Sequence, residues 1–303
     1  MTEYGLLAGQ LFNGISVASI LLLAALGLAL SFGLMRVINM AHGEILMMGG
    51  YVTYTALQIL PHGIGYPIGM IGAFIVTALF GGLLELTLIR RLYGRPLDTL
   101  LATWGVSLIM QQAARSIFGP IGDEVTAPSW LAGSLGVSSG LFRGFGLPLV
   151  RLFIIALSVA VLALITFLIA RTRVGLLVQA VHQDRDMAEA LGINTRTVDL
   201  AVFAIGSGVA GLAGSALALI APVTPTVGQS YIVYAFLVVI LGGLGSVRGT
   251  SIAAVIVGLF SAGAQIFTSV STSDVLLLVF VIAFIQFRPR GIVSASSRAL
   301  EEG

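Results

Sequence analysis

A histidine and a carboxylate stand two positions apart in the stretch VINMAHGEILMMGGYV, residues 37–52, where almost every other residue is apolar or glycine. His42 and Glu44 are the groups of this stretch that could carry a proton or hold a metal ion. Two positions on an α-helix correspond to a rotation of about 200°, so the two side chains would point to opposite faces. This geometry argues against a zinc pair of the H-E-x-x-H type and against an acid/base dyad of histidine and glutamate.

Two interpretations of this stretch remain open. In the structural one, Asn39 is the N-cap of a helix and Glu44 lies in its early turns, where a carboxylate meets the positive end of the helix dipole. In the functional one, Asn39, His42 and Glu44 form a gate at the cytoplasmic boundary, near Arg36, or contact a cytoplasmic partner.

A second polar pattern lies within an apolar run at residues 97–118. Thr103, Ser107, Gln111 and Arg115 follow one another every four residues and so share one helical face. Polar groups in a membrane span usually face the bundle interior or a wet pathway. The hydroxyl and amide groups could bind a small neutral solute, or they could hold helices together by hydrogen bonds.

Composition sets the class of protein. The 303 residues are 57% hydrophobic and 9% charged, where a soluble domain carries roughly 25% charged residues. All 15 cationic side chains are arginine, and there is no cysteine. The absence of lysine excludes a P-loop and a Schiff base, and the absence of cysteine excludes thiolate chemistry. We therefore expect no catalytic residue and no metal site, and the net charge of +2 indicates no nucleic-acid partner.

The apolar runs predict an all-α polytopic integral membrane protein with about eight to nine transmembrane helices, some short or broken. We treat residues 1–303 as a single membrane domain. The predicted spans are 6–34, 45–60, 66–89, 97–118, 149–170, 197–220, 231–244, 250–267 and 275–287.

Arginine clusters in the connecting segments predict the orientation. The three clusters fall within residues 90–95, 171–196 and 288–298. Even numbers of spans separate them, so all three can be cytoplasmic, with the N-terminus extracytoplasmic and the C-terminus cytoplasmic. Arg115, Arg143 and Arg151 lie toward the other side and oppose this majority.

Two connecting segments are long. Residues 119–148 are rich in glycine, serine and proline and are expected to form an extracytoplasmic loop. Residues 171–196 are the longest charged segment and are expected to lie in the cytoplasm. Amphipathic helical turns are predicted there from the spacing of Leu176, Leu177, Ala180, Val181, Ala188 and Leu191, with a stop at Gly192. Such a segment either docks on a soluble partner or is a solvated connection.

The sequence GSGVAG, residues 206–211, matches the dinucleotide-binding pattern G-x-G-x-x-G. That fingerprint must join a strand to a helix in water, whereas this one lies inside a predicted span. Gly206, Ala210 and Gly214 recur every four residues and indicate close helix packing instead. A weaker likeness relates EILMMGGYV to LVVILGGLGSV, two short apolar runs that meet paired glycines, as in transporters with internal repeats.

Four blocks in this order resemble one family: FGLMRVINMAHGEILMMGGYV, RTRVGLLVQAVHQDRDMAEALGINTRTVDLAVFAIGSGVAGLAG, VVILGGLGSVRGT and FRPRGI. The chain is similar, over about residues 14–292, to the permease subunits of branched-chain amino acid type ABC importers. Within that family, RRLYGRPLDTLLATWGVSLIMQQAARSIFGP resembles the first permease subunit of the urea-transporting branch.

The resemblance implies a subunit of the bacterial inner membrane that forms a path for urea by ATP-driven alternating access. It implies a second homologous permease, two cytoplasmic ABC ATPases that bind ATP and Mg²⁺, an extracytoplasmic solute-binding protein, and no cofactor in this chain. Carried over by position, the ATPase-coupling residues are Ala188, Glu189, Ala190, Leu191 and Gly192. The family's N-x-A-H-G stretch matches Asn39, Ala41, His42 and Gly43.

Other functions remain open beside this one. The cargo could instead be branched-chain amino acids or short amides. A passive channel for urea or small solutes would explain the polar residues Thr103, Ser107 and Gln111 but not the charged segment 171–196. A secondary transporter would require ionisable groups in the middle of its spans, which this sequence barely offers.

Overall fold

The computed structural model describes residues 3–35, 37–61, 63–137 and 145–293. Arg36, Arg143, Arg298 and part of the loop at 119–148 lie outside this part of the chain. The elements in chain order are α1 (Glu3–Met35), α2 (His42–Ile59), α3 (Gly65–Thr87), the 3₁₀ turn η1 (Ile89–Arg91), α4 (Pro96–Phe118), β1 (Ser134–Val137), β2 (Phe145–Pro148), α5 (Leu149–Arg171), α6 (Arg173–Gln183), α7 (Arg185–Ala190), α8 (Thr195–Ala218), α9 (Val227–Gly242), α10 (Val247–Ala264) and α11 (Val270–Phe287).

Each of the nine predicted apolar runs corresponds to a helix. Six segments within the described residues are long and apolar enough to cross a membrane: Ala8–Gly33, Gly65–Arg91, Leu149–Arg171, Thr195–Ala218, Val247–Ala264 and Val270–Phe287. The other three helices of this set are α2, α4 and α9; α9 has only 16 residues, and α2 and α4 carry the polar groups of the candidate site. The chain is thus a multi-pass helical membrane protein, and a count of eight to nine crossings stays a prediction.

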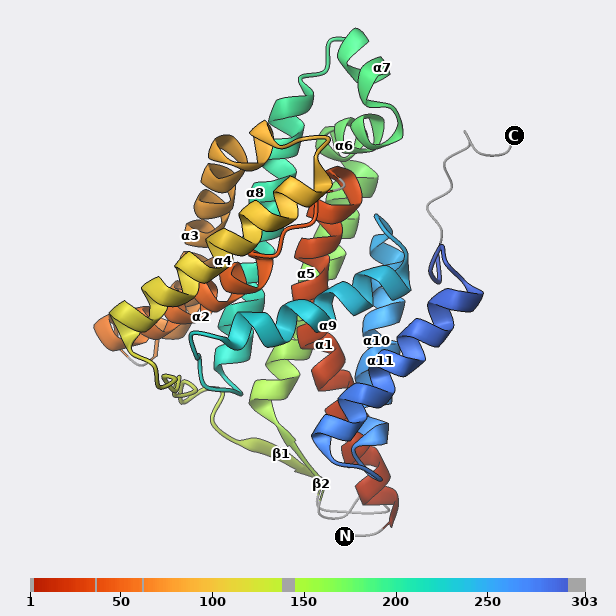
Figure 1. The fold of residues 1–303 in the computed structure, drawn as a ribbon. Helices are drawn as coiled ribbons and strands as arrows, with labels where there is room; N and C mark the ends of the chain where they lie inside the picture. The colour runs from red at the N-terminus through yellow and green to blue at the C-terminus, as the bar shows by residue number, and fades with distance from the viewer. Residues whose placement is uncertain (1–2, 36, 62, 138–144, 294–303) are drawn as a thin grey trace.

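The connecting segments gather at two opposite ends of the bundle (Figure 1). Helices α6 and α7 lie at one end, and the antiparallel pair β1–β2 lies at the other, near the start of α1. The turn between α3 and α4 lies at the same end as α7, because the Arg185 guanidinium of α7 stands 5.3 Å from the centre of the Tyr93 ring. The first two arginine clusters therefore share one end, as the orientation argument requires.

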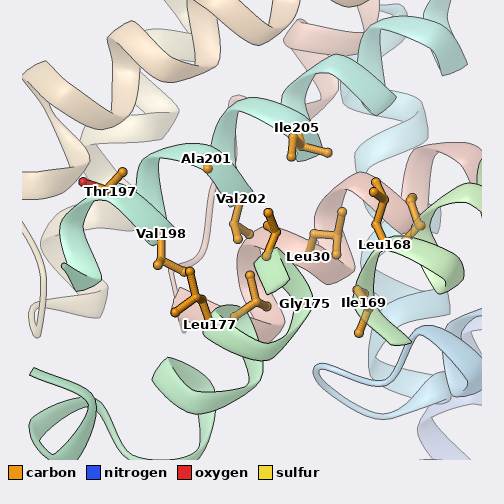
Figure 2. Close-up of a pocket in the computed structure, with 13 residues that line it drawn as sticks. Leu30, Leu168, Ile169, Gly175, Leu177, Thr197, Val198, Ala201, Val202 and Ile205 are labelled. Atoms are coloured by element: carbon orange, nitrogen blue, oxygen red, sulfur yellow. The ribbon is translucent and has the colours of Figure 1, made fainter. Parts of the chain in front are cut away.

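Helix α6 folds back against α5 and α8 through apolar side chains. Leu177 of α6 faces Val198 and Val202 of α8 across a cavity of about 200 Å³ that α5 and the end of α1 also line (Figure 2). The chain reverses at Thr172, whose hydroxyl oxygen accepts a hydrogen bond from the N–H of Gly175. This apolar packing attaches α6 to the membrane domain.

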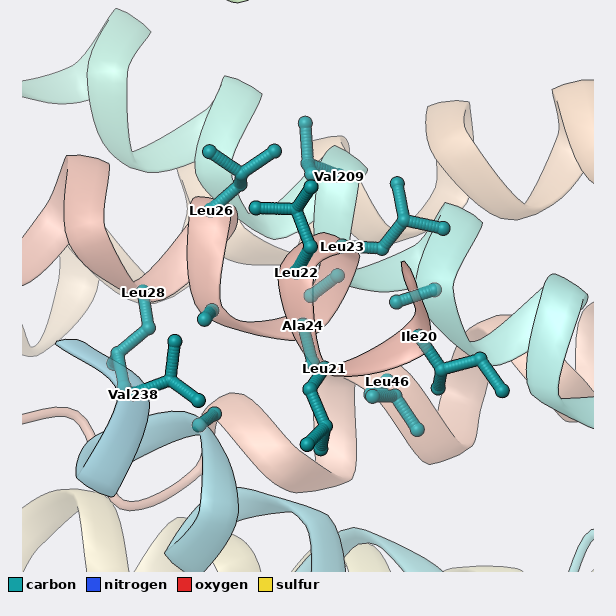
Figure 3. Close-up of a cluster of buried hydrophobic side chains, with 14 of the residues drawn as sticks. Ile20, Leu21, Leu22, Leu23, Ala24, Leu26, Leu28, Leu46, Val209 and Val238 are labelled. Carbon is teal, nitrogen blue, oxygen red and sulfur yellow. The ribbon is translucent and has the colours of Figure 1, made fainter. Parts of the chain in front are cut away.

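Helix α1 is the centre of the apolar core. Its span is 83% buried, whereas the spans formed by α5 and α11 are only 22% and 17% buried. Side chains around the whole circumference of α1 contact its neighbours, and Figure 3 shows them among Leu46 of α2, Val209 of α8 and Val238 of α9. A helix that is hydrophobic on every side belongs in the interior, as α1 does. Helices α5 and α11 lie further out, because most of their spans is exposed.

Glycines bring α8 into backbone contact with three helices. A Cβ added at Gly206 would meet the carbonyl of Gly27 in α1, one at Gly211 would meet α3 at Ala73 and Thr77, and one at Gly214 would meet the carbonyl of Leu46 in α2. The GSGVAG motif lies inside α8, so the prediction that it packs helices is confirmed. Small residues permit this approach where larger ones would separate the backbones.

We predict that Gly214→Ala destabilises the protein, because the methyl group collides with backbone that cannot rotate away. Overpacking of this kind costs about 1–3 kcal/mol. The matched control is Gly105→Ala in α4, where a Cβ meets nothing within 4 Å and alanine favours the helix. Thermal unfolding of the purified protein in detergent measures both variants. Equal melting temperatures for the two would contradict the prediction.

Candidate functional site

The polar face of α4 docks on the first turn of α2. Oε1 of Glu44 accepts hydrogen bonds from Ser107 Oγ at 2.8 Å and from Gln111 Nε2 at 2.7 Å. All three side chains are at most 5% exposed. A buried donor left without its acceptor is costly. The two polar patterns of the sequence therefore form one cluster.

Thr103 extends this cluster toward the segment that precedes α2. Its Oγ1 accepts a hydrogen bond from the backbone N–H of Met40 at 3.1 Å and lies 3.3 Å from the carbonyl oxygen of Ile38. Arg115, the last member of the predicted row, is exposed. The buried part of the polar face thus ends at Gln111.

His42 and Glu44 point in opposite directions, as their spacing predicts. Nε2 of His42 donates a hydrogen bond to the carbonyl of Ala24 in α1 at 3.0 Å, whereas Glu44 faces α4. The prediction that Asn39 is the N-cap of the helix is wrong. Ala41 occupies that position without a side-chain cap, and Oδ1 of Asn39 instead accepts from the N–H of Ala41 at 3.0 Å in a local turn.

The other oxygen of Glu44 lies against the start of α9. A Cβ added at Gly228 would collide with Oε2 of Glu44 and with the carbonyl of Gly43, so the carboxylate stands beside the first turn of that helix. Within the described residues, Oε2 of Glu44 and Nδ2 of Asn39 are buried without a hydrogen-bond partner. The same part of the chain contains no group of three His, Asp or Glu side chains that could hold a metal ion.

The predicted coupling segment consists of α6, α7 and the turn at Gly192, whose φ is +84°. Val181 and Ala188 face inward as expected, but Leu176 and Leu191 are 67% and 75% exposed. The amphipathic pattern therefore predicted only part of the inner face.

Glu189 contacts its own segment. Oε1 of Glu189 accepts a hydrogen bond from Thr195 Oγ1 at 2.5 Å and lies 3.8 Å from Nε of Arg185. Its side chain is still 55% exposed. A substitution of Glu189 would consequently disturb the join between α7 and α8 as well as any outside contact.

An ionic network at this end was not among the predicted site residues. Nη2 of Arg185 donates to Oδ2 of Asp199 at 2.6 Å, and the hydroxyl of Tyr93 donates to Oε1 of Glu85 at 3.2 Å. Arg90 binds Glu85 through both carboxylate oxygens, at 3.2 and 3.0 Å. Acidic residues inside predicted spans demand partners, and that signal at Asp199 could have revealed the network.

Tyr93 acts as a neutral donor in this network. Burial raises the pKa of Tyr93, and the carboxylates of Asp199 and Glu85 raise it further. A phenol surrounded by carboxylates keeps its proton. It can therefore donate to Glu85 while the face of its ring receives the guanidinium of Arg185.

The sequence model of a known family, described as branched-chain amino acid transport system / permease component, matches residues 10–285. The chain belongs to this permease family. It is therefore a transport subunit and not an enzyme, and such permeases need no cofactor of their own.

Several curated proteins resemble this permease. The chain is 30% identical to the high-affinity branched-chain amino acid transport system permease protein BraD of Pseudomonas aeruginosa, over 94% of both chains. It is 29% identical to the LivH protein of the corresponding system of Escherichia coli, again over 94% of each. The fructose import permease protein FrcC of Rhizobium meliloti matches 37% of the chain at 30% identity. No solved structure matches the chain significantly.

We predict that Glu44→Leu destabilises the permease strongly, because Ser107 and Gln111 lose their shared buried acceptor. Each unsatisfied donor costs about 1–3 kcal/mol. Glu44→Gln keeps an acceptor oxygen and should fall between Glu44→Leu and the wild type. Glu124→Leu, at an exposed glutamate, is the control. Thermal unfolding in detergent compares them, and a Glu44→Leu protein as stable as the control would contradict the prediction.

Proposed function

We propose that this permease is a membrane-spanning subunit of an ABC importer for branched-chain amino acids, in the bacterial inner membrane. Its partners in this proposal are a second homologous permease, two cytoplasmic ATPases and an extracytoplasmic solute-binding protein. The bundle forms part of the translocation path, and ATP binding and hydrolysis in the partners drive alternating access.

One observation carries this proposal: the similarity to BraD runs over 94% of both chains, without a large insertion or deletion of a domain. The names of BraD and of the LivH protein of Escherichia coli both state branched-chain amino acid transport. The described structure adds an exposed charged segment at one end, which a subunit driven by separate ATPases requires.

Urea is the second candidate cargo. The resemblance to the urea branch depends on residues 90–120, which form the last part of η1, the turn after it and helix α4. The neutral polar groups of this segment that could bind urea, Ser107 and Gln111, are already bonded to Glu44. They could meet a solute only after α4 separates from α2. We therefore place amino acids first and urea second.

We further propose that the buried polar cluster is a gate. The proposed gate comprises Glu44, Thr103, Ser107 and Gln111 at the contact of α2 with α4, Asn39 in the segment before α2, and His42, which binds α1 on the opposite face of α2. Hydrogen bonds hold α4 against α2 and the preceding segment, while the outer side of α4 is apolar and exposed, as at Leu101 and Ile109. Separation of α4 would open the polar groups to a pathway, and the bonds would re-form on closing.

The proposed ATPase-coupling residues are Ala188, Glu189, Ala190, Leu191 and Gly192, of which Ala188 packs inward and the other four are exposed. Support comes from Leu191, which is 75% exposed at the turn that ends α7. An apolar side chain presented to water at the tip of a short loop is suited to fill a groove on a soluble partner.

We predict ATP-dependent uptake of labelled leucine into vesicles that contain the assembled complex, its binding protein and internal ATP. Labelled urea is the comparison, and vesicles without ATP are the blank. ATP-dependent uptake of urea in place of leucine would support an importer but would identify urea as its cargo. Flux of either solute that is indifferent to ATP would overturn the importer in favour of a passive channel.

We predict that Leu191→Arg lowers this uptake by about tenfold or more, because a charge replaces the apolar group proposed to enter the ATPase groove. Leu97→Arg is a matched control, since Leu97 in the first turn of α4 is also 75% exposed but lies outside the coupling segment. Uptake rates at equal amounts of assembled complex measure the effect. Equal rates for the two variants would contradict the assignment.

A further inference from the structure

The short helix α7 has little apolar attachment to the rest of the protein. Ala188 is its one buried residue, and Met187 beside it is 57% exposed. Burial of a single methyl group contributes only about 1 kcal/mol, too little to fix a helix of six residues. In its neighbour α6, by contrast, Val178 and Val181 are buried, and Val178 belongs to the main apolar core. Polar contacts must therefore hold α7 in place.

Arg185 supplies these contacts. Its Nη2 lies 2.6 Å from Oδ2 of Asp199 and 3.2 Å from Oγ1 of Thr195, both in the first turns of α8. The Asp199 side chain is only 3% exposed, and that of Arg185 is 38% exposed. A nearly buried carboxylate without its cation would be strongly unfavourable, so this pair resists separation.

The same guanidinium reaches the turn between α3 and α4. Its Cζ lies 5.3 Å from the centre of the Tyr93 ring, and the hydroxyl of Tyr93 continues to Glu85, which is fully buried in α3. Arg90 holds the other side of that carboxylate. One side chain of α7 thus connects to α8 directly and to α3 through Tyr93 and Glu85.

The chemistry of this position requires arginine. A planar guanidinium can donate at its edge to Asp199 and Thr195 while its face lies over an aromatic ring. The ammonium of lysine is a point charge and cannot do both. By contrast, the ion pair of Arg95 and Asp98, 2.8 Å apart, is exposed on both sides and joins residues of the same helix start, so it links no separate elements.

We propose that Arg185 is the positioning residue that transmits displacement of the coupling segment to α8 and to the α3–α4 turn. This inference depends on the proposed function, because it assigns a route to the motion that the ATPases impose. The ends of two spans, α3 and α8, would then follow α7 together. Removal of Arg185 should leave ATP hydrolysis in the partners but disconnect it from transport.

The first measurement compares ATP hydrolysed with leucine transported in the reconstituted complex. Arg185→Gln should raise this ratio by about fivefold or more, while hydrolysis itself continues. Arg185→Lys should give an intermediate ratio, because it keeps the charge but not the stacked planar group. Arg95→Gln breaks the exposed pair and should match the wild type. A wild-type ratio in Arg185→Gln would overturn the proposal.

A second measurement does not depend on transport. The chain has no cysteine, so spin labels can be placed at Asp186→Cys in α7 and Arg91→Cys beside the α3–α4 turn, both exposed. Pulsed electron resonance on the assembled complex should give a narrow distance distribution in the wild-type background and a broad one with Arg185→Gln. Tyr93→Leu, which leaves the pair with Asp199 in place, should broaden it as well.

The two measurements separate this inference from the proposed function. A wild-type complex that moves no solute with ATP would contradict the importer, and the distance distributions would still test the link from α7 to the α3–α4 turn. A working importer whose distributions stay narrow in both Arg185→Gln and Tyr93→Leu would keep the function and overturn the role of Arg185. Arg95→Gln serves as the control in both.

Discussion

Backbone contact between α8 and three neighbouring helices is the constraint on which the rest of this structure depends. Gly206, Gly211 and Gly214 place α8 directly against α1, α3 and α2. Gly214 of α8 contacts α2 at Leu46, less than one helical turn beyond Glu44. This contact therefore fixes where along α4 the Glu44 side chain binds. The same helix carries Asp199 at its other end. The position of both polar clusters therefore follows from how closely α8 approaches its neighbours.

Periodicity within one segment predicted most of what belongs to single helices. The nine apolar runs, the packing role of GSGVAG and the opposite directions of His42 and Glu44 are each local properties, set by spacing along the chain. The cluster of Glu44 with Ser107 and Gln111 joins positions 63 and 67 residues apart. A repeat of polar residues shows which side of α4 is wet or bonded, but it does not show which helix lies opposite.

The wrong or partial predictions have physical reasons. Asn39 does not cap α2 because its side-chain oxygen accepts a hydrogen bond from the N–H of Ala41, in a turn that precedes the helix. Leu176 and Leu191 are exposed because α6 is packed through Gly175, Val178 and Val181 and α7 is held by charge. An amphipathic pattern assumes that apolar residues face inward. On this segment apolar residues occupy both sides, so the pattern identifies only those that face inward.

The contact between Gly43 and Gly228 brings together the starts of two short helices, α2 and α9. Helix starts carry the positive ends of their macrodipoles, so by themselves they would repel each other. Glu44, in the first turn of α2 and against the first turn of α9, places its acidic side chain between them. An acidic side chain is suited to the start of either helix, and here one buried residue stands at both. The beginnings of α2 and α9 are thereby joined through one buried side chain.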